Sequence, residues 1–170
     1  MNSKIASVAL LVFLSATALR GQRTPSPALL VLAKNENTLA IVNPTTLKVV
    51  ARVAAGPDPH EVVVSPDGRL AYVSNYGFGA YHTISVIDLV ARRALPRIDL
   101  GMLHGPHGLF FTGGELYFTA EANDVIGRYN PSARRIDWIL GTGQNRTHMV
   151  VVSKNLDRIF TSNVISGTIS

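Results

Sequence analysis

Apolar and polar residues alternate in short runs along most of the chain, and tight turns separate the runs. Residues 60–65 (HEVVVS) form one such run, the turn PDG follows at 66–68, and residues 70–75 (LAYVSN) form the next. Alternation with a period of two predicts β-strands, and the order Pro, Asp, Gly suits a tight turn. The segment is therefore predicted to be an antiparallel hairpin.

This hairpin pattern occurs twice more, each time after a histidine. His107 opens the runs HGLFFT and ELYFTA, and His148 opens HMVVVS and RIFTSN. The distance from His60 to His107 is 47 residues, and that from His107 to His148 is 41 residues. A repeat of about 40 to 45 residues with several strands per unit predicts the blades of a β-propeller.

The predicted fold is therefore all-β, a β-propeller of four-stranded antiparallel blades of the seven-bladed type. Blades are expected at residues 28–55, 60–100, 107–140 and 148–170. The first of these has runs for its second, third and fourth strands only, and the last stops in its third strand. Because an unclosed ring would expose strand edges, we expect an N-terminal fragment of about three and a half blades.

The first 20 residues follow a different pattern. A lysine at position 4 precedes a mostly apolar stretch of ten residues at 5–14, and small residues follow up to Ala18. This order is typical of a secretory signal peptide, and the apolar stretch is short for a membrane span. We expect a signal peptide at 1–20, a spacer at 21–27, and a periplasmic or extracellular mature chain with no transmembrane span. The chain has no cysteine, which excludes disulfides and thiolate chemistry.

The second predicted blade resembles the YVTN-type β-propeller repeat of surface-layer and periplasmic proteins, a group that includes the YncE-like proteins. YVSN at 72–75, SPDG at 65–68 and SVID at 85–88 stand where the family repeat has YVTN, SPDG and SVID. Later copies drift, with TGGE at 112–115 in place of SPDG. The resemblance covers residues 28–170 and implies a secreted propeller. Its better-studied relatives bind small molecules, DNA or partner proteins.

All five histidines, at positions 60, 82, 104, 107 and 148, fall in connections that are predicted to open on one face of the ring. In a four-stranded meander, the connection into the innermost strand and the connection between the second and third strands share a face. Loops on a rigid scaffold are where binding sites are usually built. The predicted binding face lies at the channel mouth, and its candidate ligand-binding residues are His60, Asn75, Tyr76, His82, His107, Glu121, Arg146, His148 and Asn163.

Several interpretations of these histidines stay open. His60, His107 and His148 take equivalent places in consecutive blades, where each could bond a neighbouring blade, contact an organic ligand, or help to ligate a divalent metal such as zinc or copper. A lactonase-like hydrolase would use the same face, with His107, His148, Arg146 and Glu121 as catalytic candidates. No GxSxG elbow, paired-carboxylate motif or phosphate loop supports catalysis. The preferred function is therefore a binding or scaffold module for a small molecule or a protein partner.

The formal net charge of the chain is +5, and many basic residues lie in the predicted outermost strands and the turns before them. These residues are Lys48, Arg52, Arg92, Arg93, Arg97, Arg134 and Arg135. Basic residues on an outer strand guard against edge pairing, but a basic rim could also bind DNA in a salt-dependent way. The loop YGFGAYH at 76–82 could stack bases or set ligand specificity. A DNA-binding propeller is therefore a further alternative.

Overall fold

The computed structural model describes residues 24–170, and every regular element longer than three residues in that range is a β-strand. The strands form four antiparallel sheets, which confirms the all-β prediction. The predicted signal peptide and residues 21–23 of the spacer lie outside the described residues. Between residues 24 and 170, no helix is long and apolar enough to cross a membrane.

Each sheet is a meander in which strands that are consecutive in sequence pair with one another. The first sheet contains β1 (Leu29–Ala33), β2 (Thr38–Val42) and β3 (Val49–Ala54). The second contains β4 (Pro59–Val64), β5 (Leu70–Asn75), β6 (Thr83–Asp88) and β7 (Arg93–Asp99). The third contains β8 (Pro106–Thr112), β9 (Glu115–Ala120), β10 (Val125–Asn130) and β11 (Arg135–Gly141). The fourth contains β12 (Thr147–Val152), β13 (Ile159–Asn163) and β14 (Thr168–Ile169).

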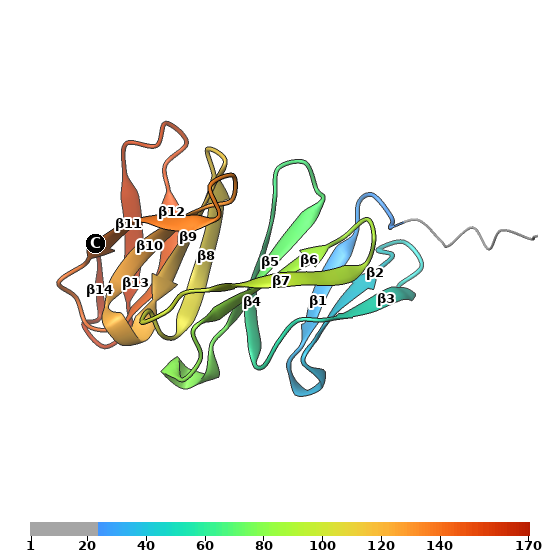
Figure 1. Ribbon diagram of the computed structural model, residues 1–170, viewed down its shortest axis with the longest axis horizontal. Helices are drawn as coiled ribbons and strands as arrows, with labels where there is room; N and C mark the ends of the chain where they lie inside the picture. Colours follow the sequence, from blue (N-terminus) through green and yellow to red (C-terminus); the bar gives the residue numbers. More distant parts are fainter. Residues whose placement is uncertain (1–23) are drawn as a thin grey trace, which may run out of the picture.

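The sheets lie side by side in chain order (Figure 1). The first strands of the last three sheets contact one another, β4 with β8 and β8 with β12. These strands are therefore innermost, whereas β7 and β11 form the opposite edges of their sheets. Pro96 lies in β7, as expected of an edge strand, where its missing N–H breaks no ladder between two partners. This is the arrangement of consecutive blades in a β-propeller.

The hydrophobic core lies between the sheets. Successive side chains of a strand point to opposite faces, so the middle strand β5 serves two neighbours. Val73 packs with the first sheet, whereas Tyr72 packs with Leu116 and Phe118 of the third sheet. A third cluster, which includes Val150 and has Trp138 packed against it, joins the third and fourth sheets. Burial on both faces explains why the second and third strands of a blade read as nearly continuous apolar runs.

The connections at the two ends of the sheets differ. One end, here called the cluster end, carries the short 3₁₀ helices η1 (Lys34–Glu36), η2 (Gly77–Gly79) and η3 (Glu121–Asn123) and the connections that lead into β4, β8 and β12. In Figure 1, η1 (blue) and η2 (green) lie along the lower edge of the molecule. The opposite end, the turn end, carries the tight turns, including residues 65–69 between β4 and β5.

Candidate functional site

The three inner strands begin in the same way. The residue before each of them, Asp58, Gly105 or Arg146, has a positive φ of 44°, 64° or 61°. Its carbonyl accepts a hydrogen bond from the backbone N–H of Tyr76, Glu121 or Val164, respectively, at the end of the second strand. The next two positions are Pro-His, Pro-His and Thr-His. Because the backbone conformation and the hydrogen bond are the same before each inner strand, the three histidines take equivalent positions in their sheets.

Each histidine lies in a β-bulge. The pairing of β4 with β5 shifts between Pro59 and Val62, that of β8 with β9 between Pro106 and Leu109, and that of β12 with β13 between Thr147 and Met149. A bulge places an extra residue on one strand and re-aims the side chains beside it. The bulge thus turns each imidazole out of the regular alternation of the strand.

Hydroxyl groups bond the extra backbone N–H groups of two bulges. Ser74 Oγ accepts from the N–H of Glu61, and Thr119 Oγ1 accepts from the N–H of Gly108. The Thr119 hydroxyl also donates to the carbonyl of His148, at 2.7 Å, and so joins the third sheet to the fourth. The bulges are thus supported by the strands beside them.

The rings of His60, His107 and His148 pack against one another in a row at the cluster end, together with the ring of Tyr76. The centroids of His60 and His107 are 4.3 Å apart, and those of His107 and His148 are 3.7 Å apart with an interplanar angle of 34°. Tyr76 lies 4.8 Å from His60 and packs edge-on against His107 at 4.9 Å. We call these four residues the histidine cluster. It draws on three sheets, which places its members side by side only in the folded chain.

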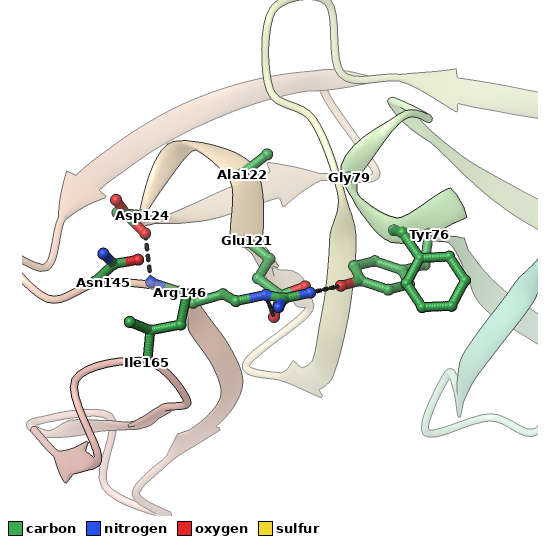
Figure 2. Close-up of a pocket in the computed structure, with 9 residues that line it drawn as sticks. Tyr76, Gly79, Glu121, Ala122, Asp124, Asn145, Arg146 and Ile165 are labelled. Atoms are coloured by element: carbon green, nitrogen blue, oxygen red, sulfur yellow. Dashed lines mark hydrogen bonds and ion pairs between the residues drawn. The ribbon is translucent and has the colours of Figure 1, made fainter.

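A polar network extends from the histidine cluster, and Figure 2 shows its members Tyr76, Glu121 and Arg146. Arg146 donates from Nη2 to the Tyr76 hydroxyl at 2.6 Å, and its Nε lies 2.9 Å from Glu121 Oε1. The same carboxylate oxygen is hydrogen-bonded to Nδ1 of His148 at 3.0 Å. The Glu121 side chain is only 3% exposed, so these partners compensate a buried carboxylate.

A second ion pair lies on the other side of the cluster. The Lys34 ammonium group lies 2.9 Å from Asp58 Oδ1 and donates to Nδ1 of His60 at 2.6 Å. The other carboxylate oxygen of Asp58 accepts the backbone N–H of Gly77 at 2.8 Å. Lys34 lies in η1, which connects β1 and β2 of the first sheet, so the row of imidazoles has a cation and a carboxylate at both ends.

The environment fixes the charge states of the cluster. Burial, aided by the charges that His148 and His60 carry when protonated, lowers the pKa of His107 to about 4. Burial and the charge of Lys34 lower the pKa of His60, against the opposing effect of Asp58. Burial raises the pKa of Glu121, but hydrogen bonds with Tyr76 and His148 and the charge of Arg146 outweigh it and hold the pKa below its ordinary value. At neutral pH, His107 is therefore uncharged beside an ionised carboxylate.

A pocket of about 380 Å³ adjoins the network. Tyr76, Glu121 and Arg146 belong both to the network and to the pocket wall. The remaining lining residues are Phe78, Gly79, Ala122, Asp124, Asn145 and Ile165. None of the three clustered histidines lines this pocket, and His107 is 3% exposed. Within residues 24–170, Nδ1 of His107 is buried without a hydrogen-bond partner.

The structure brings together six of the nine residues predicted to bind a ligand: His60, Tyr76, His107, Glu121, Arg146 and His148. Asn75 and Asn163 are instead buried, and their side chains bond neighbouring backbone and side-chain groups. The amide of Asn75 donates to the carbonyl of Ala55 at 2.7 Å and accepts from Ser85, and that of Asn163 donates to Thr168. These contacts give both asparagines a role in holding the cluster-end loops in place.

His82 also lies outside the histidine cluster. Its Nδ1 is 3.0 Å from Asp99, and its ring centroid is 5.2 Å from that of His104. The five histidines thus form a packed group of three and a separate, partly buried pair.

The metal site at His60, His107 and His148 stays a prediction. Across residues 24–170, no group of three or more His, Cys, Asp or Glu side chains is arranged to hold a metal ion. The rings of His107 and His148 pack against each other with a tilt of 34°. The catalytic roles suggested for His107, His148, Arg146 and Glu121 also stay predictions, although the hydrogen bond between His148 and Glu121 is one that a general base requires.

Sequence reasoning missed three charged residues of the site: Lys34, Asp58 and Asp124. Asp124 Oδ1 accepts the backbone N–H of Arg146 at 2.6 Å and so fixes the start of the last inner strand. A signal was present in the repeat itself. Asp58 and Asp124 each stand directly before a predicted strand, at a chain reversal where the backbone takes a positive φ, and Asp, like Asn and Gly, is a residue type that tolerates this conformation.

The basic residues of the outer strands lie where the sequence placed them. Arg93 and Arg97 in β7 and Arg135 in β11 are exposed at the sheet edges, away from the histidine cluster. Arg52 in β3 pairs with Glu36 at 3.1 Å. The DNA-binding alternative stays a prediction.

Comparison with known proteins identifies the fold. No family model matches the chain, and no curated protein sequence matches it. Among solved structures, it is similar to hydrazine synthase of Kuenenia stuttgartiensis, with a TM-score of 0.71 and 19% sequence identity. The match covers 84% of this chain and 44% of that chain, so the sequence spans less than half of its neighbour's length. At this identity, the likeness supports a shared fold.

Proposed function

We propose that this chain is a ligand-binding module whose binding face is the cluster end, with the pocket beside Arg146 as the ligand site. One observation carries the proposal: the pocket wall contains a buried carboxylate, Glu121, paired with the partly exposed Arg146, which also bonds Tyr76, and the three residues come from the ends of three different sheets. Buried charges are costly unless partners compensate them, so such a network favours a site over a purely structural connection. Pockets of this size suit small molecules.

Two further parts of the proposal rest on sequence. The resemblance of residues 72–75 and 85–88 to YVTN-type repeats supports a relationship to the YncE-like proteins, and the N-terminal pattern supports export to the periplasm or cell exterior. A protein partner at the same face would be held by the exposed loops around the pocket. A lactonase-like hydrolase is the second candidate, supported by the hydrogen bond between Glu121 and Nδ1 of His148, the kind of contact that orients a general base.

A ligand screen with a pocket-blocking variant tests the proposal. Ala122 is exposed and lines the pocket opposite Gly79, so Ala122→Phe should fill the pocket without disturbing the core. Ala133→Phe, in an exposed turn at the other end of the sheets, is the matched control. Saturation-transfer NMR against a library of small metabolites that includes lactones should find molecules that bind the wild type and Ala133→Phe but not Ala122→Phe.

Two results would contradict the proposal. One is a screen with no binder at millimolar concentration, and the other is a set of binders that Ala122→Phe leaves unaffected. Disappearance of a lactone signal during the measurement, dependent on His148, would favour the hydrolase candidate.

A further inference from the structure

A second pocket lies at the turn end, between the second and third sheets, and has a volume of about 430 Å³. Its floor is apolar. Leu70, Leu95 and Tyr129 line it and pack against Tyr72 and Ile98, two buried residues that also line it. All five belong to one hydrophobic cluster, so the floor is continuous. A pocket of this size with an apolar lining suits a small molecule.

The charged residues that line this pocket are two arginines, Arg97 in β7 and Arg134 in the turn between β10 and β11. Among residues 24–170, the arginines that form ion pairs are Arg52, Arg128 and Arg146. Within the same range, no acidic side chain lines the pocket. The pocket therefore combines an apolar floor with positive charge that no carboxylate of these residues neutralises.

Arg134 lies close to the aromatic part of the floor. Burial raises the pKa of Tyr129, and the positive charge of Arg134 acts against this rise. Burial also raises the pKa of Tyr72, as do the charges that Tyr129 and Asp67 carry when ionised. Such effects weaken with distance, so Arg134, Tyr129 and Tyr72 are near neighbours. Asp67 does not line this pocket, and its carboxylate bonds its own turn.

The repeat shows what an arginine in this turn does when it has an oxygen acceptor. Leu47, Arg92 and Arg134 take the same place before β3, β7 and β11, with φ values of 56°, 55° and 52°. Arg92 donates from Nε to Oγ1 of Thr24 at 3.0 Å, and Thr24 lines the corresponding gap between the first and second sheets. At the place that corresponds to Thr24, Arg134 has the open pocket.

A carboxylate with an apolar body matches these features, because guanidinium groups form charge-assisted hydrogen bonds with carboxylates and apolar groups gain free energy on leaving water. We propose that this pocket binds a small aliphatic carboxylate, with its charged head at Arg134 and its chain on the floor of Tyr72, Leu95 and Tyr129. Arg97 adds positive charge to the same pocket. This site is separate from the pocket at the cluster end and does not depend on the proposed function.

Two pairs of variants isolate the charge of the pocket. Arg134→Gln and Arg97→Gln each remove one positive charge that lines it. Arg135→Gln in β11 and Arg93→Gln in β7 are the matched controls, because both residues are exposed and lie outside the pocket lining. All four substitutions change the net charge equally, so a difference between them reports the position of the charge.

The test is a titration of the full chain with hexanoate, acetate or hexan-1-ol, followed by amide NMR shifts at pH 7.5 and low salt. Hexanoate should bind at least about tenfold more tightly than acetate, because its methylene groups leave water. Arg134→Gln should weaken hexanoate about two- to fivefold and Arg97→Gln about twofold, without an effect on hexan-1-ol. The two controls should leave hexanoate unchanged, and added salt should weaken hexanoate alone.

Three outcomes would overturn the proposal: hexanoate binding no more tightly than acetate, equal hexanoate affinities in wild type and Arg134→Gln, or no saturable shifts at residues 129–134. Ala122→Phe separates the two sites, since it fills the cluster-end pocket and should leave hexanoate binding unchanged. A loss of hexanoate binding in this variant would place the carboxylate at the cluster end and also overturn the proposal. Carboxylates of this class are therefore scored apart from the screen at the cluster end.

Discussion

The two ends of the sheets are built from the same strands but make different contacts. At the turn end, Asp88 bonds N–H groups two and three residues ahead, and Ser65 and Asp67 bond each other and the strand that follows. At the cluster end, Lys34 reaches His60, and Arg146 reaches Tyr76 across 70 residues of sequence. These turn-end contacts can form in one hairpin, whereas these cluster-end contacts need adjacent sheets to dock. The site therefore depends on how the sheets are packed.

The largest expected effect comes from forcing two inner strands apart. A Cβ on Gly108 would lie 2.7 Å from the carbonyl oxygen and from Cα of His148 and Met149, respectively, so β8 must move away from β12. We expect Gly108→Ala to lower the free energy of unfolding by about 2 to 3 kcal/mol, as overpacking of rigid backbone does. Urea denaturation measures the change.

Gly141→Ala is the control for this substitution. Gly141 lies at the end of the outer strand β11, and no atom lies within 4 Å of the place that an alanine Cβ would take there. Its replacement should therefore change the free energy of unfolding by less than about 0.5 kcal/mol. Equal effects of the two substitutions would show that close packing of β8 on β12 is not what holds the cluster end.

The next effect is a loss of stability in mild acid. His107 has a pKa of about 4 in the folded chain against 6.5 when unfolded, so between these values the unfolded chain binds more protons. Stability is therefore fully present above pH 6.5 and falls as the pH drops towards 4. From pH 7 to pH 5, this residue alone should lower the free energy of unfolding by about 2 kcal/mol.

The lowered pKa of His60 also makes the folded chain less stable as the pH falls. Urea denaturation at the two pH values should show a clearly smaller loss in His107→Phe, which keeps an aromatic ring but cannot be protonated. A variant that loses as much stability as the wild type would rule out His107 as a source of the pH dependence.

The smallest effect is expected at the exposed ion pair of the cluster end. The Lys34 and Asp58 side chains are 43% and 23% exposed, so water screens their attraction. Lys34→Gln should lower the free energy of unfolding by about 0.5 kcal/mol, and the difference should vanish in 1 M NaCl. Lys154→Gln at the turn end is the comparison and should have no effect. A loss above about 2 kcal/mol would mean that the pair is part of the buried network after all.

Sequence patterns predicted the fold because strand alternation and turn chemistry are local. The hairpin at residues 60–75 was predicted from the alternation of apolar and polar side chains. The edge position of the strand that contains Pro96 was predicted from the missing N–H of this proline. The convergence of His60, His107 and His148 could also be predicted, since equivalent residues of neighbouring repeats must lie side by side.

The partners of these histidines could not be predicted, because they depend on loop conformation. Lys34 contacts His60 only because η1 turns it towards the next sheet, and Asp124 enters the pocket wall through a backbone with positive φ. Asn75 was a reasonable candidate as the last residue of a strand at the cluster end. Its full burial follows from the approach of Gly56, whose backbone leaves no room for solvent beside the amide.

The extra residue in each inner strand has a consequence for protein engineering. Because strand side chains alternate with a period of two, the insertion resets the phase: β4 follows one phase at Pro59 and the opposite phase from Val62 onward. Deleting a single residue between these positions would not merely shorten the loop. It would exchange the inward and outward sets of Val62, Val63 and Val64, so the length of this segment is as constrained as its composition.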